Sequence, residues 1–411
     1  MNDRSSTDTS SVPTTVFPTE RSAECPFDPA AEYVDLRASE PLDKVACPAG
    51  FDAYVLSGYE EMRTLLNDPR LSSRGALSNH IITDRDTNTE PAPGSIIHLD
   101  GPEHARLRRM LTPEFTVKRM RALREYVAGL VDERIDAMLA SDGPVDLYQD
   151  FALPIPSLVI CELLGVPYAD RDRFQDQTTI LVSIDADPEL VAATAEEFQG
   201  YIAGLVIAKM QNPGDDLLSR LIQRGNESGT PLTVPELVTL GLTMLIAGHE
   251  TTANMIGLST LAFLRNPEQL ALLREDPSLA ESAVEEMLRY LTIVQWGLLR
   301  YATEDIEYGE ETIKAGEWLV AVLASGNRDE SVFPDAAAID VRRNPTAHLA
   351  FGFGAHQCIG QQLARVELQE VFSRLYQRIP TLRLAVPFEE IEFKNNALVY
   401  GVRALPVTWE R

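Results

Sequence analysis

One long helical pattern constrains the fold of this 411-residue chain more than any other feature. It starts at a capping box formed by Thr233, Pro235 and Glu236. The apolar periodicity then continues without a break until Asn266 and Pro267. At 1.5 Å per residue, such a helix is roughly 50 Å long. A helix of this length crosses an entire globular protein, so the rest of the chain is expected to pack around it.

The rest of the chain also reads as mainly helical. Strand-like runs are short and few, which predicts a mainly α fold with small β-sheets, an α+β class. Further helices are expected at 59–67, 102–111, 117–140, 158–164, 188–209, 216–224, 267–275, 279–291 and 359–379. Strands are expected near 53–56, 300–308, 317–323 and within 382–407. Neither an internal repeat nor a linker divides the chain after its polar start, so residues 25–411 are expected to form one domain behind a disordered tail, 1–24.

Composition excludes several classes of partner. A formal charge of −26 and a pI near 4.6 argue against binding to nucleic acid or to anionic membranes, because both require a basic surface. The four cysteines have no paired spacing, so no disulfide framework or zinc site is predicted. The N-terminal residues lack the apolar core of a signal peptide, and we expect a cytoplasmic protein in a reducing compartment.

A glycine-punctuated loop near the C-terminus carries the strongest chemical signal. The stretch from Phe351 to Gly360 reads FGFGAHQCIG and delivers Cys358 to the start of a helix. A thiolate is stabilised at a helix N-terminus, and the glycines let the backbone approach a large planar ligand closely. Two other interpretations are an inert buried thiol and a hydrolase nucleophile with His356 as its base. Residues two apart point to nearly opposite sides of a helix, which disfavours the second of these.

The middle of the long helix carries a second unusual cluster. Ala247 and Gly248 have minimal side chains and precede the acid Glu250 and the alcohol Thr251. Small residues leave space beside a flat cofactor, and a threonine hydroxyl can bond either a helix carbonyl or a bound oxygen molecule. His249 followed by Glu250 superficially matches a zinc-protease helix, but that motif requires another histidine four residues after the first. Position 253 is alanine, which excludes the zinc interpretation.

The loop fits the Phe-x-x-Gly-x-His-x-Cys-x-Gly signature, and the chain therefore resembles the cytochrome P-450 family of haem-thiolate monooxygenases. The resemblance covers residues 25–409 and is greatest to soluble bacterial members. It implies the cytochrome P-450 fold, with the long helix lying over haem b, iron protoporphyrin IX. It makes Cys358 the metal ligand, with Phe351 and Gly360 beside the cofactor. Glu250 and Thr251 then form the catalytic pair that delivers protons and steers oxygen–oxygen cleavage away from peroxide release.

The same resemblance assigns residues around the haem. The propionates are expected to contact His104 and Arg108, which lie four apart on one helix face, together with Arg300 and His356. Ala247 and Gly248 are expected to line the cofactor. A structural network behind the haem is expected to join Glu286, Arg289 and Arg343. For any single base, an ordinary surface residue is the alternative interpretation.

The substrate is expected to be a bulky apolar compound such as a macrolide, sterol or statin. The turn-rich segment 72–97 is expected to cover its cavity, with a mobile surface loop as the alternative. Pocket residues are assigned by family position and apolar character, although core packing explains any one of them equally well: Ile96, Ile97, Ile180, Met244, Ala247, Ile293, Val294 and Val399.

The chain contains no flavin or ferredoxin module, so the resemblance implies separate partners: an NAD(P)H-dependent ferredoxin reductase and a ferredoxin. O2 is the co-substrate. Seven basic residues crowd positions 106–124 of this acidic chain and are expected to receive the ferredoxin, assisted by Arg365. Two other functions remain open, a peroxide-using haem-thiolate peroxygenase and a non-catalytic haem sensor. Retention of Glu250 and Thr251 disfavours both.

Overall fold

The computed structural model describes residues 17, 21, 25–38, 42–74, 81, 90–182 and 186–410. Its helices are α1 (Glu32–Ala38), α2 (Tyr59–Leu65), α3 (Gly101–Leu111), α4 (Val117–Ala122), α5 (Arg124–Ala140), α6 (Pro154–Leu164), α7 (Arg171–Val182), α8 (Pro188–Gln211), α9 (Leu217–Glu227), α10 (Val234–Arg265), α11 (Pro267–Glu275), α12 (Ala280–Leu291), α13 (Leu323–Gly326) and α14 (Gln361–Arg378). Its strands are β1 (Asp43–Ala46), β2 (Asp52–Leu56), β3 (Leu71–Ser72), β4 (Val145–Asp146), β5 (Leu298–Ala302), β6 (Ile306–Tyr308), β7 (Glu311–Ile313), β8 (Trp318–Ala321), β9 (Arg383–Leu384) and β10 (Pro406–Thr408).

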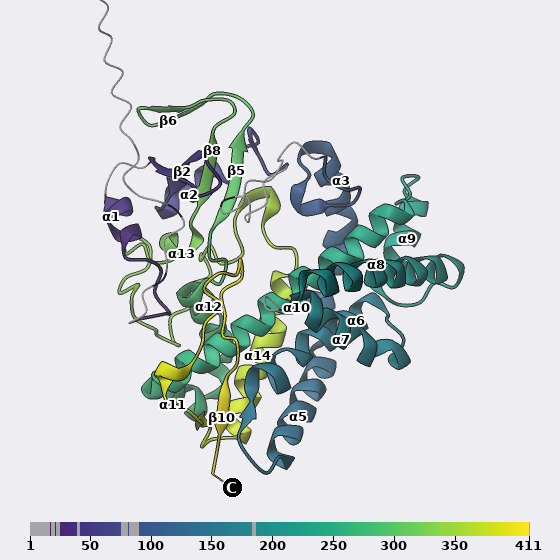
Figure 1. The fold of residues 1–411 in the computed structure, drawn as a ribbon, viewed down its shortest axis with the longest axis vertical. Coiled ribbons are helices and arrows are strands. Elements are labelled where there is room, and N and C mark those ends of the chain that lie inside the picture. The colour runs from purple at the N-terminus through teal and green to yellow at the C-terminus, as the bar shows by residue number, and fades with distance from the viewer. Residues whose placement is uncertain are drawn as a thin grey trace, which may run out of the picture.

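The strands form small sheets at the edges of the helical part. The largest sheet has the order β1-β2-β8-β5-β3, and Figure 1 shows it beside α1 and α2. Strands β2 and β8 are parallel, whereas β5 pairs antiparallel with β8 and sets Arg300 opposite Leu319. A second sheet has the order β4-β10-β9, and β6 pairs with β7. The predicted class, mainly α with small β-sheets, is confirmed.

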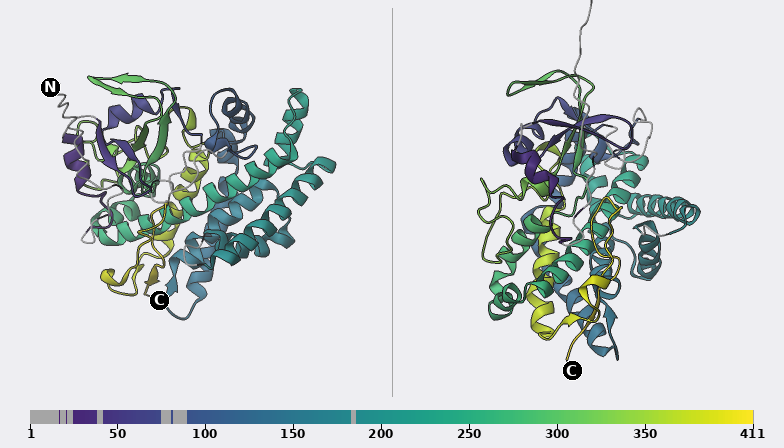
Figure 2. Two further views of the ribbon diagram at one scale, coloured as in Figure 1. Left: turned by 45° about the horizontal axis from the view of Figure 1, so that its top comes forward. Right: turned by 60° about the vertical axis from the view of Figure 1, so that its left-hand side comes forward.

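Helix α10 is the axis around which the helical part is built. Thr233 and Glu236 form the capping box, and the helix then runs unbroken to Arg265, as the sequence pattern predicted. Figures 1 and 2 show it crossing the molecule among α6, α8, α12 and α14. Its second half is buried, from Ala253 to Phe263, whereas Ile246 and Ala247 near its middle are exposed. One stretch of an otherwise buried helix is therefore left open to a cavity or to solvent.

Several predicted boundaries are wrong. The helix predicted for 117–140 is broken at Leu123, whose amide bonds Met120 O at 3.1 Å and closes a tight turn between α4 and α5. The strand predicted for 300–308 is two strands, β5 and β6, separated by a bend. Helix α7 was missed because its polar sequence has little apolar periodicity.

The expected N-terminal tail, 1–24, lies mostly outside the described residues. Two of its residues are described, and both contact the fold. Phe17 is 1% exposed, and its amide donates to Ala46 O at 2.9 Å. Arg21 donates to the carbonyl of Thr292 at 3.2 Å and lies over the Tyr400 ring. Contacts with the core thus begin before residue 25.

Among the described helices, α8 has the length and apolar composition that could cross a membrane. Its buried side chains include Phe198, Ile202 and Leu205, and it packs against α10. A Cβ added at Gly241 of α10 would lie 3.1 Å from Ile202 Cγ2, which shows how closely the two helices approach. The exposed residues of α8 include the acids Glu196 and Glu197 and the apolar residues Leu190, Ile207 and Met210. Helix α8 is therefore packed into the fold along part of its surface.

Candidate functional site

The loop that carries Cys358 is held by local backbone contacts. The amide of Cys358 donates to Phe351 O at 2.9 Å, and α14 begins three residues after the cysteine. Gly352 and Gly354 have φ values of 68° and 76°. A Cβ at Gly354 would lie 2.4 Å from Leu66 O, so only glycine lets the loop pack this closely against the end of α2.

Two opposing influences act on the pKa of the Cys358 thiol. The thiol is accessible, yet enough protein surrounds it for desolvation to raise its pKa. The amides of Gly360 and Gln361 at the start of α14 and the positive charges of Arg108 and Arg365 act in the other direction. Amide donors and cations directed at a sulfur favour its thiolate form, which is the form that ligates metal.

A compact group of cationic and imidazole side chains accompanies this loop. The rings of His104 and His356 lie 4.1 Å apart. Burial, with help from His356 and Arg108, lowers the pKa of His104 to about 4. His356 Nε2 lies 3.3 Å from Asp100 Oδ1 and 3.1 Å from the Ser73 hydroxyl. The structure therefore brings together residues from α3 and the cysteine loop that the sequence analysis assigned to one site.

Asp100 was not predicted. It occupies the N-cap position of α3, but its carboxylate makes no cap bond and instead accepts hydrogen bonds from Ser72 and Ser73. Burial opposes its ionisation, and the bonds from His356, Ser72 and Ser73 outweigh that effect and lower its pKa. Asp100 therefore orients the His356 ring through a hydrogen bond to Nε2, while the His104 ring packs against it.

Arg108 and Arg300 complete the fit to a dianionic cofactor. Neither has a carboxylate ion-pair partner among the described residues. Arg300 donates to Leu299 O at 2.7 Å, and burial lowers its pKa to about 10. Burial also lowers the pKa of Arg108. Two partly buried guanidinium groups without a carboxylate partner suit a ligand that brings its own negative charges, as the two propionates of haem do.

The middle of α10 presents small and polar groups. The hydroxyl of Thr251 donates to Ala247 O at 2.6 Å, the helix-carbonyl bond expected from the sequence. Ala247 is exposed and Met244 is buried. A Cβ added at Gly248 would lie 2.8 Å from Ile160 Cδ1, so α6 packs closely on α10 at this glycine. A cofactor contact by Gly248 stays a prediction.

Glu250 faces a cation from a distant part of the chain. Its Oε1 lies 3.5 Å from Lys394 Nζ, and Lys394 in turn donates to Tyr148 Oη at 2.7 Å. Burial raises the pKa of Glu250, while Lys394 and Asn254 partly offset this effect. The adjacent His249 is buried, and burial lowers its pKa to about 4, so it is neutral. Sequence reasoning missed Lys394 and Tyr148, because nothing near either residue marks it.

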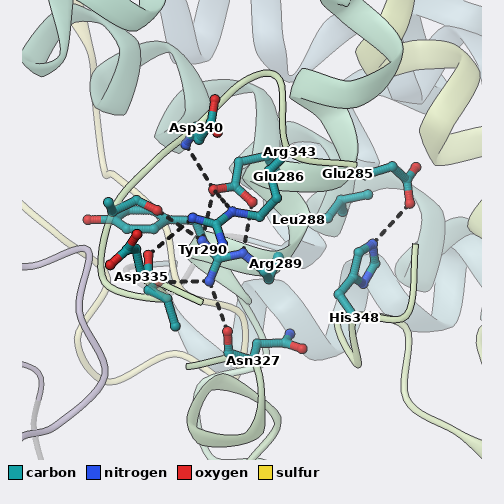
Figure 3. Close-up of polar contacts among 12 residues, drawn as sticks. Glu285, Glu286, Leu288, Arg289, Tyr290, Asn327, Asp335, Asp340, Arg343 and His348 are labelled. Carbon is teal, nitrogen blue, oxygen red and sulfur yellow. Dashed lines mark hydrogen bonds and ion pairs between the residues drawn. The ribbon is translucent and has the colours of Figure 1, made fainter. Parts of the chain in front are cut away.

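Glu286 and Arg289 of α12 form the core of a buried network, shown in Figure 3. Both side chains are 0% exposed, and Arg289 donates to Glu286 through two bonds of 2.8 Å each. Arg343 Nε lies 3.2 Å from Glu286 Oε1, and the amide of Asp340 donates to the same oxygen at 2.9 Å. Arg289 also donates to the carbonyls of Asn327, Ala336 and Ala338.

The predicted pocket residues are distributed between surface and core. Ile97 is 50% exposed, whereas Ile96 and Ile293 are buried in the helical core. Ile180, Val294 and Val399 are half-buried, and Val294 pairs with Val399 in an isolated bridge. Two further large apolar side chains, Ile246 and Leu398, are exposed. Much of the segment 72–97 lies outside the described residues.

Comparison with known proteins agrees with this geometry. The family model described as Cytochrome P450 matches residues 51–395. Pentalenic acid synthase from Streptomyces avermitilis is 46% identical, over 96% of this chain and 97% of its own length. Vitamin D3 dihydroxylase from Streptomyces griseolus is 44% identical, over 98% of this chain and 100% of its own length. The crystal structure of CYP105P1 in complex with filipin I superposes with a TM-score of 0.89 at 45% identity, covering 97% of this chain and 99% of that one.

Proposed function

Because this chain belongs to the cytochrome P450 family and is a haem-thiolate monooxygenase with haem b as its cofactor, we propose that it hydroxylates a bulky, hydrophobic small molecule. The observation that carries the proposal is that Cys358, His104, Arg108 and His356 lie together. Apolar side chains are exposed at Ile97, seven positions before His104, and at Ile246 on α10. The names of the relatives above refer to small molecules: one is a synthase of pentalenic acid, one hydroxylates vitamin D3, and one was crystallised with filipin I.

In this proposal the chain holds the cofactor from two sides. Cys358 provides the thiolate ligand, assisted by the amides at the start of α14. His104, Arg108, Arg300 and His356 bind the propionates. When bound, the haem iron activates O2 and supplies the oxygen atom that enters a carbon–hydrogen bond of the substrate.

Thr251 and Glu250 handle protons in this scheme. The Thr251 hydroxyl, which bonds Ala247 O, can rotate to donate toward the pocket. The raised pKa of Glu250 brings its titration closer to neutral pH, which suits a group that takes up and releases protons during turnover. Proton supply at the right atom separates hydroxylation from release of hydrogen peroxide.

We propose that the substrate lies among Ile97, Ile246, Val294, Leu398 and Val399, with Ile96, Ile180, Met244, Ala247 and Ile293 behind or beside them. Ile246 and Leu398 are 53% and 38% exposed, although large apolar side chains are ordinarily buried. These residues come from separate segments, and their side chains offer hydrophobic contact with few polar anchors. Such a surface selects for apolar bulk.

We propose that electrons reach the protein in the cytoplasm from NAD(P)H through a ferredoxin reductase and a ferredoxin. Several of the basic residues first considered for docking are engaged within the protein. Arg106 pairs with Glu236, Arg119 with Glu114, Arg124 with Glu370 and Arg365 with Glu285. Arg109, Lys118 and Arg121 are exposed and form no ion pair within the described part of the chain. They are therefore the charges available to an acidic ferredoxin.

The test is a spectral titration of the ferric holoprotein with vitamin D3, filipin I and pentalenic acid precursors, followed by turnover with NADPH, ferredoxin reductase and ferredoxin. A change from low spin to high spin and a product that is heavier by one oxygen atom support the proposal. If every apolar probe leaves the spectrum unchanged and NADPH is not consumed, the protein is not a hydroxylase of this class. The variant Thr251→Ala is expected to keep the spectrum and lower hydroxylation about 100-fold, with electrons diverted to hydrogen peroxide.

A further inference from the structure

Glu250 is paired with a part of the chain that also carries Leu398 and Val399, two of the proposed substrate contacts. Its cation, Lys394, belongs to the C-terminal hairpin of residues 393–402. This hairpin is closed by the bridge between Phe393 and Val402, and the amide of Lys394 donates to Gly401 O at 2.8 Å. The turn of the same hairpin carries Leu398.

Lys394 is fixed in an unusual environment for a lysine. It is 6% exposed, and lysines are rarely this buried without a partner. Its ammonium group donates to Tyr148 Oη and lies 4.6 Å from the centre of the Tyr148 ring. Tyr148 begins the π-helical turn Tyr148–Ala152, which packs against α10. Tyr148 therefore anchors the cation within reach of Glu250.

The hairpin lies directly against α10 at the level of Glu250. A Cβ added to Gly401 would stand 2.0 Å from Oδ1 of Asn254, one helical turn after Glu250. A Cβ on Gly257 would stand 3.3 Å from Tyr148 Cδ2 and 3.4 Å from Val402 Cγ2. Two glycines thus allow a contact too close for any other residue to fit without displacement. A shift of this hairpin would therefore displace side chains of α10.

The other side of the hairpin contacts the predicted pocket. Leu398 is 38% exposed, and Val399 pairs with Val294. Backbone bonds tie this part to the segment after α12: Gln295 N donates to Leu398 O at 2.9 Å, and Tyr400 N donates to Ile293 O at 2.8 Å. Leu398 lies four positions after Lys394 in the chain. A molecule that presses on Leu398 therefore acts on the element that holds Lys394.

We propose that Lys394 positions the Glu250 carboxylate, and that the hairpin 393–402 makes this contact respond to what fills the apolar pocket. The inference rests on the proposed role of Glu250 as a proton carrier. Lys394 touches no reacting atom and acts through Glu250. Its function is to keep the carboxylate ionised and oriented until a bound molecule moves the hairpin.

The charges around Glu250 support this role. Lys394 faces it from the hairpin, His249 beside it on α10 is neutral, and Tyr148 is kept protonated because burial raises its pKa. Asp146 acts on Tyr148 from the preceding segment. Lys394 is therefore the main cation that opposes the burial of Glu250. Removal of an opposite charge at this distance raises a carboxyl pKa by about one to three units.

The direct test is infrared spectroscopy of the ferric holoprotein, which detects the carboxyl C=O band of protonated Glu250 without turnover. In Lys394→Met, the pH at which this band disappears should rise by about one to three units. In Lys394→Arg, this pH should return most of the way to the wild-type value. The band is identified by its loss in Glu250→Gln. Tyr148→Phe, which keeps the ring and removes the anchor, should shift it in the same direction as Lys394→Met, and provides a second test if that variant folds poorly.

The pocket side of the inference is tested with Leu398→Trp, which adds bulk to the hairpin turn without changing a charge. The Glu250 band should shift in this variant, whereas the matched surface variant Lys314→Met, which breaks the exposed pair with Asp305, should leave it unchanged. An unshifted band in Lys394→Met and Tyr148→Phe overturns the positioning role. An unshifted band in Leu398→Trp overturns the link to the pocket.

Failure of the inference and failure of the proposed function are distinguishable. If Glu250→Gln does not increase the share of electrons released as hydrogen peroxide, the proton-carrier role itself is wrong. If Glu250→Gln does increase it, but Lys394→Met has the wild-type pH profile of peroxide release, only the inference about Lys394 is wrong.

Discussion

Two carboxylates of this protein, the buried Glu286 and the half-buried Glu250, face cations but differ in how many donors surround them. Glu286 accepts two bonds from Arg289, one from Arg343 and one from the amide of Asp340. Glu250 faces one ammonium group at 3.5 Å, and burial raises its pKa. A carboxylate whose oxygens are saturated with donors is held in one position. A carboxylate with few donors can move, and the raised pKa of Glu250 suits a group that takes up and releases protons.

The largest effect is expected at the saturated site. Replacing Arg289 with methionine leaves Glu286 buried without its main partner, so the free energy of unfolding should fall by about 3–5 kcal/mol. Urea denaturation followed by circular dichroism measures this loss. A loss below about 1 kcal/mol would show that the network of Figure 3 is no more stabilising than a surface ion pair.

The pH dependence of stability sharpens the comparison, using Glu285 as a second saturated carboxylate. Burial opposes its ionisation, but His348 and Arg365 lower its pKa to about 2, below the ordinary value of 4.5. Its stabilisation is therefore complete above pH 4.5 and is lost as the pH falls toward 2. Wild type should exceed Glu285→Gln by about 3 kcal/mol more at pH 6 than at pH 2.

Glu250 should show the opposite slope. Because its pKa is raised in the folded state, the folded protein favours the protonated form, and its contribution becomes unfavourable as the pH rises above the unfolded value of 4.5. Glu250→Gln should therefore gain stability relative to wild type as the pH rises. At pH 6 its free energy of unfolding should be at most about 1 kcal/mol below that of wild type. Urea titrations of both variants across the same pH series decide the point, and parallel slopes would remove the distinction drawn between the two carboxylates.

The smallest effect is expected at the surface. Lys314 and Asp305 form a 2.9 Å ion pair in which both side chains are more than half exposed. Lys314→Met should change the free energy of unfolding by less than about 0.5 kcal/mol, because solvent and salt screen such pairs. Thermal denaturation at low and high salt checks this, and a larger loss would mean that solvent exposure is not what separates weak pairs from strong ones here.

Which features could be predicted from the sequence depends on how far apart in the chain the contacting residues lie. The capping box of α10, the pair Glu286–Arg289 and the cysteine loop are formed by residues within a few positions of one another, and these were identified correctly as local features. The contacts of Lys394 with Tyr148 and of His356 with Asp100 span 246 and 256 residues. No local periodicity encodes such contacts.

Conflicts between local propensity and packing explain the remaining errors. The helix pattern of 117–140 continues through Leu123, where the structure turns so that α4 and α5 can both pack against α14. At Gly248 the structure adds a neighbour that the sequence did not indicate, because the atom that a Cβ would meet belongs to Ile160 of α6. A sequence marks where a small residue stands, but only the fold shows which neighbour requires it.

The central claim is that Cys358 ligates the haem iron as a thiolate, and the absorption spectrum of the reduced holoprotein under carbon monoxide tests it most directly. Thiolate ligation predicts a strongly red-shifted carbonyl band in the wild-type protein. The band should be lost in Cys358→Ala, while the circular dichroism of the helices is retained. An ordinary haem–carbonyl band in the wild type, or an unchanged red-shifted band in Cys358→Ala, would contradict the account.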